Sequence, residues 1–305
     1  MWSPDDLDIQ IIKAMASPSS FQWDPRISYA HVAKGLAIDE ETVRNRLRRM
    51  NEAGFLKGWQ LILNPILLGR EAASVELRVG NSESKTDVIP RLSLVEGVTL
   101  IDDFYGSELA VHLLYDSERT LTRQIQLIAS LCGCPAPAWW KLGFPPCELT
   151  PTKTDWRIIQ TLITNARGKL SDVAHSLQLS NRTVKRRMQR LVEGNAFYLD
   201  PILNVGKVGG VRCRFWIVCE TDKKRAIDSK VLSGLKRIIS THTAPQEYSL
   251  FVVHCANAGE VQEISQWLKE QDGVKEVRSN IEVEHIRVLG WLAGEIEKRS
   301  STPAS

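Results

Sequence analysis

The feature that most constrains this chain is an internal repeat. Four short motifs recur in the same order: residues 8–12 match 155–159, 32–36 match 173–177, 42–50 match 183–191, and 64–67 match 200–203. The offset drifts from 147 to 136 residues, as small loop insertions would cause. Ordered self-similarity of this kind indicates a duplicated structural unit. A length of 305 residues, at about 150 per domain, also predicts two similar halves.

Each half begins with the pattern of three helices. In the first half, Leu7, Ile11, Ile12 and Met15 recur at helical spacing after an acidic first turn. The residues expected at the helix ends are Ser28, Asp39 and Gly54 in the first half and Ser171, Ser180 and Gly194 in the second. An apolar stretch ending at an Asn-Pro or Asp-Pro turn follows each third helix, which predicts a wing or a crossing strand.

The remainder of each half alternates strands and helices. The first half predicts strands at 73–79, 98–102, 109–115 and 139–144, with helices at 86–92 and 121–131. The second half predicts strands at 211–219, 248–255 and 274–283, with helices at 223–235 and 261–268, and a less clear second strand. The order β-α-β-β-α-β is typical of a ferredoxin-like sheet domain. Prolines from 145 to 151 predict a short, stiff linker between the halves.

Composition excludes several classes of protein. No run approaches the roughly 18 apolar residues of a membrane span, and the acidic N-terminus does not resemble a signal peptide. We therefore expect a cytoplasmic protein with no membrane partner. Six cysteines are too few for a disulfide scaffold and lack zinc-finger spacing, so no metal or other cofactor is expected. Motifs for a nucleophile elbow, a phosphate loop or a zinc protease are missing as well.

Positive charge is concentrated in one segment. Residues 150–208 carry ten basic and four acidic side chains, whereas residues 1–70 carry nine and eight and residues 71–149 carry six and eleven. Attraction to phosphate requires a local concentration of this kind rather than a basic average. The segment from 150 to 208 is therefore the strongest candidate for contact with double-stranded DNA.

The third helix of each half supplies the candidate DNA contacts. Val43, Leu47 and Met50 define one inward stripe, and Val184, Met188 and Leu191 define the other. Arginine and glutamine on the outward arcs can read base edges or hold phosphates. The candidates are Thr42, Asn45, Arg46, Arg48, Arg49, Ser180, Arg182, Thr183, Lys185, Arg186, Arg187, Gln189 and Arg190. Glu41 would repel phosphate, so the third helix of the second half is expected to bind DNA more tightly than that of the first half. The alternative is that both arcs are ordinary solvated helix faces.

These residues resemble a known family, the Lrp/AsnC (feast/famine) transcription regulators. The stretch from Arg26-Ile27-Ser28 through residues 43–58 to Leu63-Asn64-Pro65 is similar to the family's winged helix-turn-helix with its crossing strand. Residues 155–203 resemble it more weakly, because they lack the family's Gly-Phe-Ile-like tripeptide after the third helix. The resemblance implies an α+β chain of two winged helix-turn-helix domains, each followed by a ferredoxin-like domain. The implied boundaries are 1–70, 71–148, 149–208 and 209–298, with a flexible tail at 299–305.

The resemblance also implies partners. Family members pair through their sheet domains, so we expect the two halves to form a covalent pseudo-dimer whose unequal helices prefer an asymmetric site. Further copies can associate through the same domains. Such regulators often bind a small effector, commonly an amino acid, which here points to Tyr105, Gly106 and Ser107. The matching stretch 244–247 lacks the glycine, and a plain turn glycine is the alternative at Gly106.

An enzyme of a different class remains open. Siroheme decarboxylases resemble two paired AsnC-like chains, and they rely on a strand rich in His, Arg, Tyr and Asn beside the tetrapyrrole. The corresponding residues here are 102–106 and 241–245, where Asp102 and Asp103 would repel carboxylates and only His242 suits the role. His112 and His254 fit core or interface positions better than ligand positions. A scaffold that has kept the fold but lost DNA contact is a third interpretation.

Overall fold

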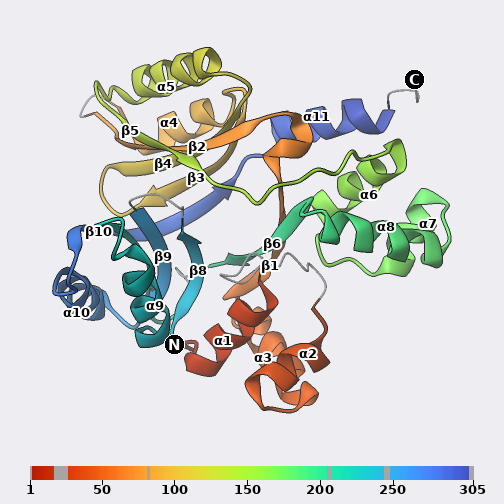
Figure 1. The fold of residues 1–305 in the computed structure, drawn as a ribbon, viewed down its shortest axis with the longest axis horizontal. Coiled ribbons are helices and arrows are strands. Elements are labelled where there is room, and N and C mark those ends of the chain that lie inside the picture. The colour runs from red at the N-terminus through yellow and green to blue at the C-terminus, as the bar shows by residue number, and fades with distance from the viewer. Residues whose placement is uncertain are drawn as a thin grey trace. The chain divides into compact units, whose positions relative to one another are not determined.

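A computed structural model describes residues 2–16, 27–80, 83–204, 206, 208–243 and 248–301 (Figure 1). The chain divides into two compact units. One unit comprises residues 1–58 with 200–283, and the other comprises residues 59–199 with 284–305. Each unit therefore combines the helical segment of one half with the sheet segment of the other half. The α+β class expected from the sequence is confirmed, with three helices followed by a strand and a β-α-β-β-α-β segment in each half.

The first unit combines a helical segment with a sheet segment that contains further helices. The helical segment consists of α1 (Asp6–Met15), α2 (Tyr29–Leu36) and α3 (Glu40–Glu52). Its sheet segment contains β7 (Val211–Cys219), α9 (Lys224–Gly234), β8 (Ile238–Thr243), β9 (Tyr248–Cys255), α10 (Ala258–Lys269) and β10 (Val274–Arg287). The antiparallel order β10-β7-β9-β8 is that of a ferredoxin-like sheet. Alternate residues of β7 and β9, such as Phe215 and Phe251, pack against α9 and α10 in one core.

The second unit repeats this plan. Its sheet segment contains β2 (Glu71–Arg78), α4 (Lys85–Leu92), β3 (Val98–Phe104), β4 (Glu108–Tyr115), α5 (Glu118–Cys132) and β5 (Ala138–Leu142). The strands pair in the order β5-β2-β4-β3. Its helical segment contains α6 (Lys153–Thr164), α7 (Leu170–Leu177) and α8 (Asn181–Glu193). The strands predicted at 211–219 and 248–255 coincide with β7 and β9, and the other predicted strands lie within a few residues of those found.

Two strands that follow the third helices pair with each other. They are β1 (Leu56–Leu63), which leads into the short helix η1 (Pro65–Leu68), and β6 (Phe197–Leu203). The amide of Asn204 donates to the carbonyl of Phe55 in the first unit, and the amide of Asn64 donates to the carbonyl of Ala196 in the second. The chain thus passes from one unit to the other within these strands, as expected for crossing strands.

Helix ends agree with the sequence at three of four predicted caps. Ser28, Asp39 and Ser180 each accept a hydrogen bond from a backbone amide at the start of α2, α3 and α8. The prediction for Ser171 was wrong, because α7 begins at Leu170 and Lys169 occupies its cap without a side-chain bond. Gly54 follows α3 with φ of +74°, a conformation that favours glycine.

Helix α11 (Gly290–Ser301) had no counterpart in the sequence analysis. It packs on α6, where Leu292 and Ile296 join the core of the second helical segment. Residues 299–301 of the expected tail are therefore helical, and 302–305 lie outside the described residues. Across the described ranges, none of the helices combines the length and apolar character required to cross a membrane.

Candidate nucleic-acid interface

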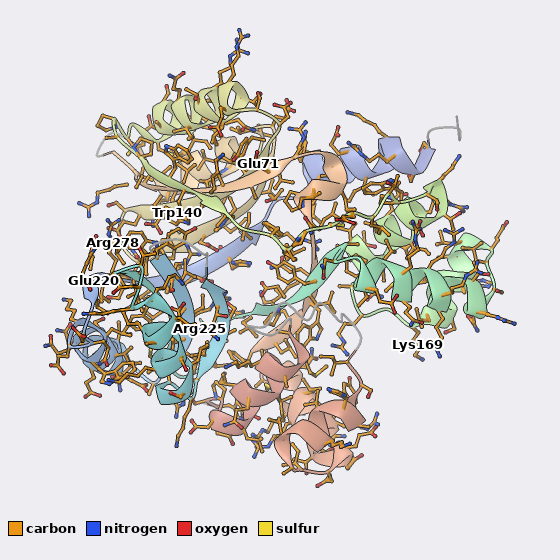
Figure 2. All side chains as sticks on the ribbon, viewed as in Figure 1. Glu71, Trp140, Lys169, Glu220, Arg225 and Arg278 are labelled. Atoms are coloured by element: carbon orange, nitrogen blue, oxygen red, sulfur yellow. The ribbon has the colours of Figure 1, made fainter. Side chains whose placement is uncertain are left out.

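The third helices α3 and α8 present their predicted apolar stripes to the core. Val43, Leu47 and Met50 are buried on α3, and Val184, Met188 and Leu191 are buried on α8. The opposite faces of both helices are exposed. Figure 2 shows the many side chains that extend from the second helical segment into solvent, with Lys169 labelled at the start of α7. The predicted division of α3 and α8 into a buried face and an exposed face is therefore correct.

A buried carboxylate fixes two arginines of each third helix. In the first copy, Asp8 accepts from Arg46 Nη1 at 2.9 Å and from Arg49 Nη2 at 3.1 Å. In the second copy, Asp155 accepts from Arg187 Nη1 at 3.0 Å and from Arg190 Nη1 at 2.9 Å. Both aspartates are completely buried and occupy the third position of a capping box at the start of α1 or α6. The two copies thus share one constellation.

The electrostatics of this constellation favour the ionised carboxyl. Burial on its own raises the pKa of Asp155, but hydrogen bonds from the Thr152 amide and hydroxyl and from Arg187 bring that pKa below its ordinary value. In the first copy, Asp5 also bonds Arg46, at 2.6 Å. Two carboxylates therefore face two guanidinium groups in the first copy, whereas one carboxylate faces two in the second.

The basic side chains on the outward face of α3 pair with acidic or polar side chains of the same helix. Arg44 pairs with Glu40 at 2.8 Å and with Glu41 at 3.5 Å. Arg48 donates to Asn45 and lies 3.9 Å from Glu52. The amide and hydroxyl of Thr42 both bond the Asp39 cap. A phosphate approaching this face must therefore displace existing ion pairs.

The outward face of α8 differs. Arg182, Lys185 and Arg186 are exposed and form no ion pair within the part of the chain that the structure describes. Gln189 donates to Glu193, and Ser180 and Thr183 bond each other at the start of the helix. Helix α8 carries five basic residues and one acidic residue, against four and three on α3. The structure thus leaves three cations available on α8.

Four predicted DNA contacts take a different position from the one expected. Arg46, Arg49, Arg187 and Arg190 fold back onto Asp8 or Asp155. Arg49 and Arg190 remain about half exposed. The sequence analysis missed both aspartates, although each lies in the first repeated motif and three residues after a helix cap. Those two signals together would have identified them.

The predicted effector residues lie at the turn between β3 and β4. Gly106 has φ of +88°, so the turn itself explains a glycine there. Gly106 and Ser107 line a shallow hollow of about 280 Å³ together with Val79, Gly80, Glu83 and Lys85. Tyr105 is exposed but does not line this hollow. Both charged groups of the lining are paired, because Lys85 lies 2.5 Å from Asp103 and Glu83 lies 3.1 Å from Arg91.

The residues considered for the enzyme interpretation form an internal network. Buried Asp102 accepts from His112 Nε2 at 2.8 Å and from His285 Nδ1 at 2.6 Å. The other ring nitrogen of His285 lies 2.9 Å from the amide of Gln60 on β1. His254 is fully buried and contacts Phe55 edge to face. The side chain of His242 and residues 244–247, including the stretch compared with Gly106, lie outside the described residues.

Comparison with known proteins identifies both helical segments. Residues 4–57 match a model described as winged helix-turn-helix DNA-binding, and residues 152–192 match the AsnC-type helix-turn-helix domain. The duplication predicted from the four repeated motifs agrees with these two matches. Both segments are therefore DNA-binding domains of one structural type.

Similar proteins fall into two groups. The regulatory protein AsnC of Haemophilus influenzae is 23% identical over 42% of this chain and 85% of its own length. The transcriptional regulator Ptr1 of Methanocaldococcus jannaschii is 31% identical over 71 residues, which are 23% of this chain and less than half, 44%, of Ptr1. The siroheme decarboxylase NirDL has a similar fold, with a TM-score of 0.57 and 14% identity over 97% of this chain and 98% of NirDL.

Proposed function

We propose that this chain, which belongs to the Lrp/AsnC family of transcription regulators, binds double-stranded DNA as a covalent pseudo-dimer and thereby regulates transcription in the cytoplasm. The observation that carries this proposal is the exposed basic face of α8. The cations of this face form no ion pair with the residues that the structure describes, so they are available to replace the counterions of a phosphate backbone. No enzymatic step is required of the chain.

The contacts divide between the two third helices. Arg182, Lys185 and Arg186 bind phosphates or guanine edges from α8, because arginine reaches both. Helix α3 docks more weakly through Asn45 and Arg48, since its ion pairs with glutamate must first open. The preferred DNA site is consequently asymmetric, with the stronger half facing α8.

The pseudo-dimer is supported by the exchange of segments between the compact units. Pairing of β1 with β6 joins the two halves of the sequence at the strands that leave α3 and α8. Covalent linkage holds two binding modules at an effective concentration in the millimolar range. Pairing of the two modules is then independent of protein concentration, and further association of copies is not needed for it.

Salt-dependent DNA binding tests this proposal. The affinity of the full chain for a duplex selected from random sequences should fall steeply with salt, with a log–log slope of about −0.9 for each phosphate contact. Arg186→Ala should weaken binding about tenfold and reduce that slope by about one, whereas Arg48→Ala should have a smaller effect. Equal losses at the two positions would contradict the asymmetric assignment, and a flat salt dependence would contradict DNA binding itself.

A second candidate function rests on the fold shared with NirDL over nearly the whole chain. A tetrapyrrole enzyme would need side chains that favour its carboxylates, but Asp102 is occupied by two histidines and Lys85 by Asp103. Addition of siroheme to the purified chain distinguishes the two candidates. A shift of the siroheme Soret band that saturates at one equivalent would favour the enzyme, and the spectrum of free siroheme is expected to stay unchanged.

A further inference from the structure

The same buried ion-pair cluster occurs in both helical segments, which indicates a role beyond local packing. One completely buried carboxylate, Asp155, joins the start of α6 to the second and third turns of α8. Its four contacts come from the Thr152 amide and hydroxyl on one side and from Arg187 and Arg190 on the other. Asp8 makes the equivalent contacts with the Asp5 amide, Arg46 and Arg49 in the first segment.

Geometry limits the rotation of α8. Arg187 and Arg190 lie three residues apart, so they are neighbours along one side of the helix. Both oxygens of a single carboxylate are used, one for each guanidinium. A rotation of α8 about its axis would break at least one of these bonds and leave a buried charge without its partner. Such a loss is strongly unfavourable inside a protein.

The rotation of α8 about its axis determines which of its side chains face solvent. With Arg187 and Arg190 bonded to Asp155 at the start of α6, the other basic side chains of α8, those of Arg182, Lys185 and Arg186, are exposed. The carboxylate also pairs with the charges of Arg187 and Arg190, of which the Arg190 side chain stays about half exposed. Without it, five cations of α8 would be available for phosphates in many orientations.

From this geometry we infer that Asp155 is a positioning residue for DNA recognition, which confines Arg187 and Arg190 and thereby converts general phosphate attraction into sequence discrimination by Arg182 and Arg186. The inference rests on the proposed function. Asp8 performs the same task in the first segment, where Asp5 neutralises the second guanidinium. In the second segment that charge is uncompensated, so the removal of Asp155 has the larger effect on DNA.

The test uses the full chain and two duplexes, one selected from random sequences by the wild-type protein and one scrambled. Asp155→Asn keeps an acceptor for the Thr152 amide but removes the charge that holds the arginines. It should lower the ratio of selected to scrambled affinity at least tenfold. Affinity for the scrambled duplex should rise, and its salt slope should steepen by up to about 0.9 for each arginine released.

Two further variants separate positioning from charge and from folding. Asp172→Asn removes an exposed carboxylate of α7 that does not bond Arg187 or Arg190, so the affinity ratio should stay at the wild-type value. Arg187→Met breaks half of the cluster without freeing a cation, and it should lower the ratio with no gain on the scrambled duplex. Arg187→Met decides the question if the thermal midpoint shows that Asp155→Asn does not fold.

The outcomes are distinct. A merely structural role would lower both affinities together and leave their ratio unchanged, which would overturn the inference. A wild-type ratio in both Asp155→Asn and Arg187→Met would overturn it as well. Failure of the wild-type chain to bind either duplex in a salt-dependent manner would refute the proposed function instead.

Discussion

At the scale of single residues, burial has changed the protonation of a histidine. His254 has no exposed surface and lies against Phe55, the residue that precedes β1. Burial, with a smaller contribution from nearby Arg237, lowers the pKa of His254 to about 4. The imidazole is therefore neutral in the folded chain at neutral pH. A buried histidine with a lowered pKa therefore reduces the free energy of unfolding at low pH.

The pH dependence of stability follows from this pKa. The unfolded chain, with a histidine pKa near 6.5, takes up the proton first, so stability should fall as the pH drops from about 6.5 to 4. The contribution of His254 is roughly 3 kcal/mol at the low end of this range. Urea unfolding at several pH values should show that His254→Leu removes this part of the slope.

Exposed histidine provides the control for that experiment. His175 lies on the surface of α7, so His175→Leu makes the same replacement at an exposed position and its unfolding is measured over the same pH range. An identical slope in His254→Leu and the wild-type chain between pH 6.5 and 4 would refute the assignment. The comparison uses slopes rather than absolute stabilities, because replacing any buried side chain also changes packing.

At the scale of elements, helix α11 shows what sequence patterns did not predict. Residues 290–301 contain few apolar side chains, and Leu292 and Ile296 alone do not define a strong amphipathic stripe. The helix is stabilised by tertiary contacts instead. Arg299 lies over the ring of Trp156, and Ser300 donates to Gln160, both on α6. Packing partners distant in the sequence decide such elements, and no local period reveals them.

Stability should depend on α11 through its buried side chains. Ile296 has no exposed surface in the core of the second helical segment. Ile296→Ala should therefore lower the free energy of unfolding by about 2–5 kcal/mol, the range for a large aliphatic residue removed from a core. Leu94→Ala, at a largely exposed position, serves as the matched control and should change it by less than about 0.5 kcal/mol. Equal stabilities of the two variants in urea would contradict the role assigned to α11.

At the scale of the whole molecule, the repeat and the local periods predicted most of the fold. Helix caps, the β-α-β-β-α-β order and the crossing strands depend on short-range patterns, and the structure contains them. Which sheet shares a compact unit with which helical segment depends on contacts such as Arg237 with Asp6, 231 residues apart, that no pattern specifies. The helical wheel located the α-carbons of Arg49 and Arg190 correctly, but long side chains fold back, and their end groups lie on Asp8 and Asp155.

The asymmetry of the molecule leads to a prediction that concerns both halves together. Glu41 and Asn45 on α3 occupy the positions that Arg182 and Arg186 occupy on α8. The double substitution Glu41→Arg and Asn45→Arg should make the outward faces alike. The variant should select a more nearly palindromic DNA site than the wild-type chain, and its salt slope should steepen by about two, one unit for each added phosphate contact.

The reciprocal exchange provides the control, because it makes the outward faces alike by removing cations from α8 instead of adding them to α3. Arg182→Glu with Arg186→Asn should also favour a more symmetric site, but with lower affinity and a shallower salt slope. Sequences selected from a random pool by the three proteins, together with hydroxyl-radical footprints, measure both quantities. A wild-type site that is already a perfect palindrome, protected equally in its two halves, would contradict the asymmetry. Unequal protection in the wild-type chain, equalised by the double arginine variant, would locate its origin in these two positions of α3 and α8.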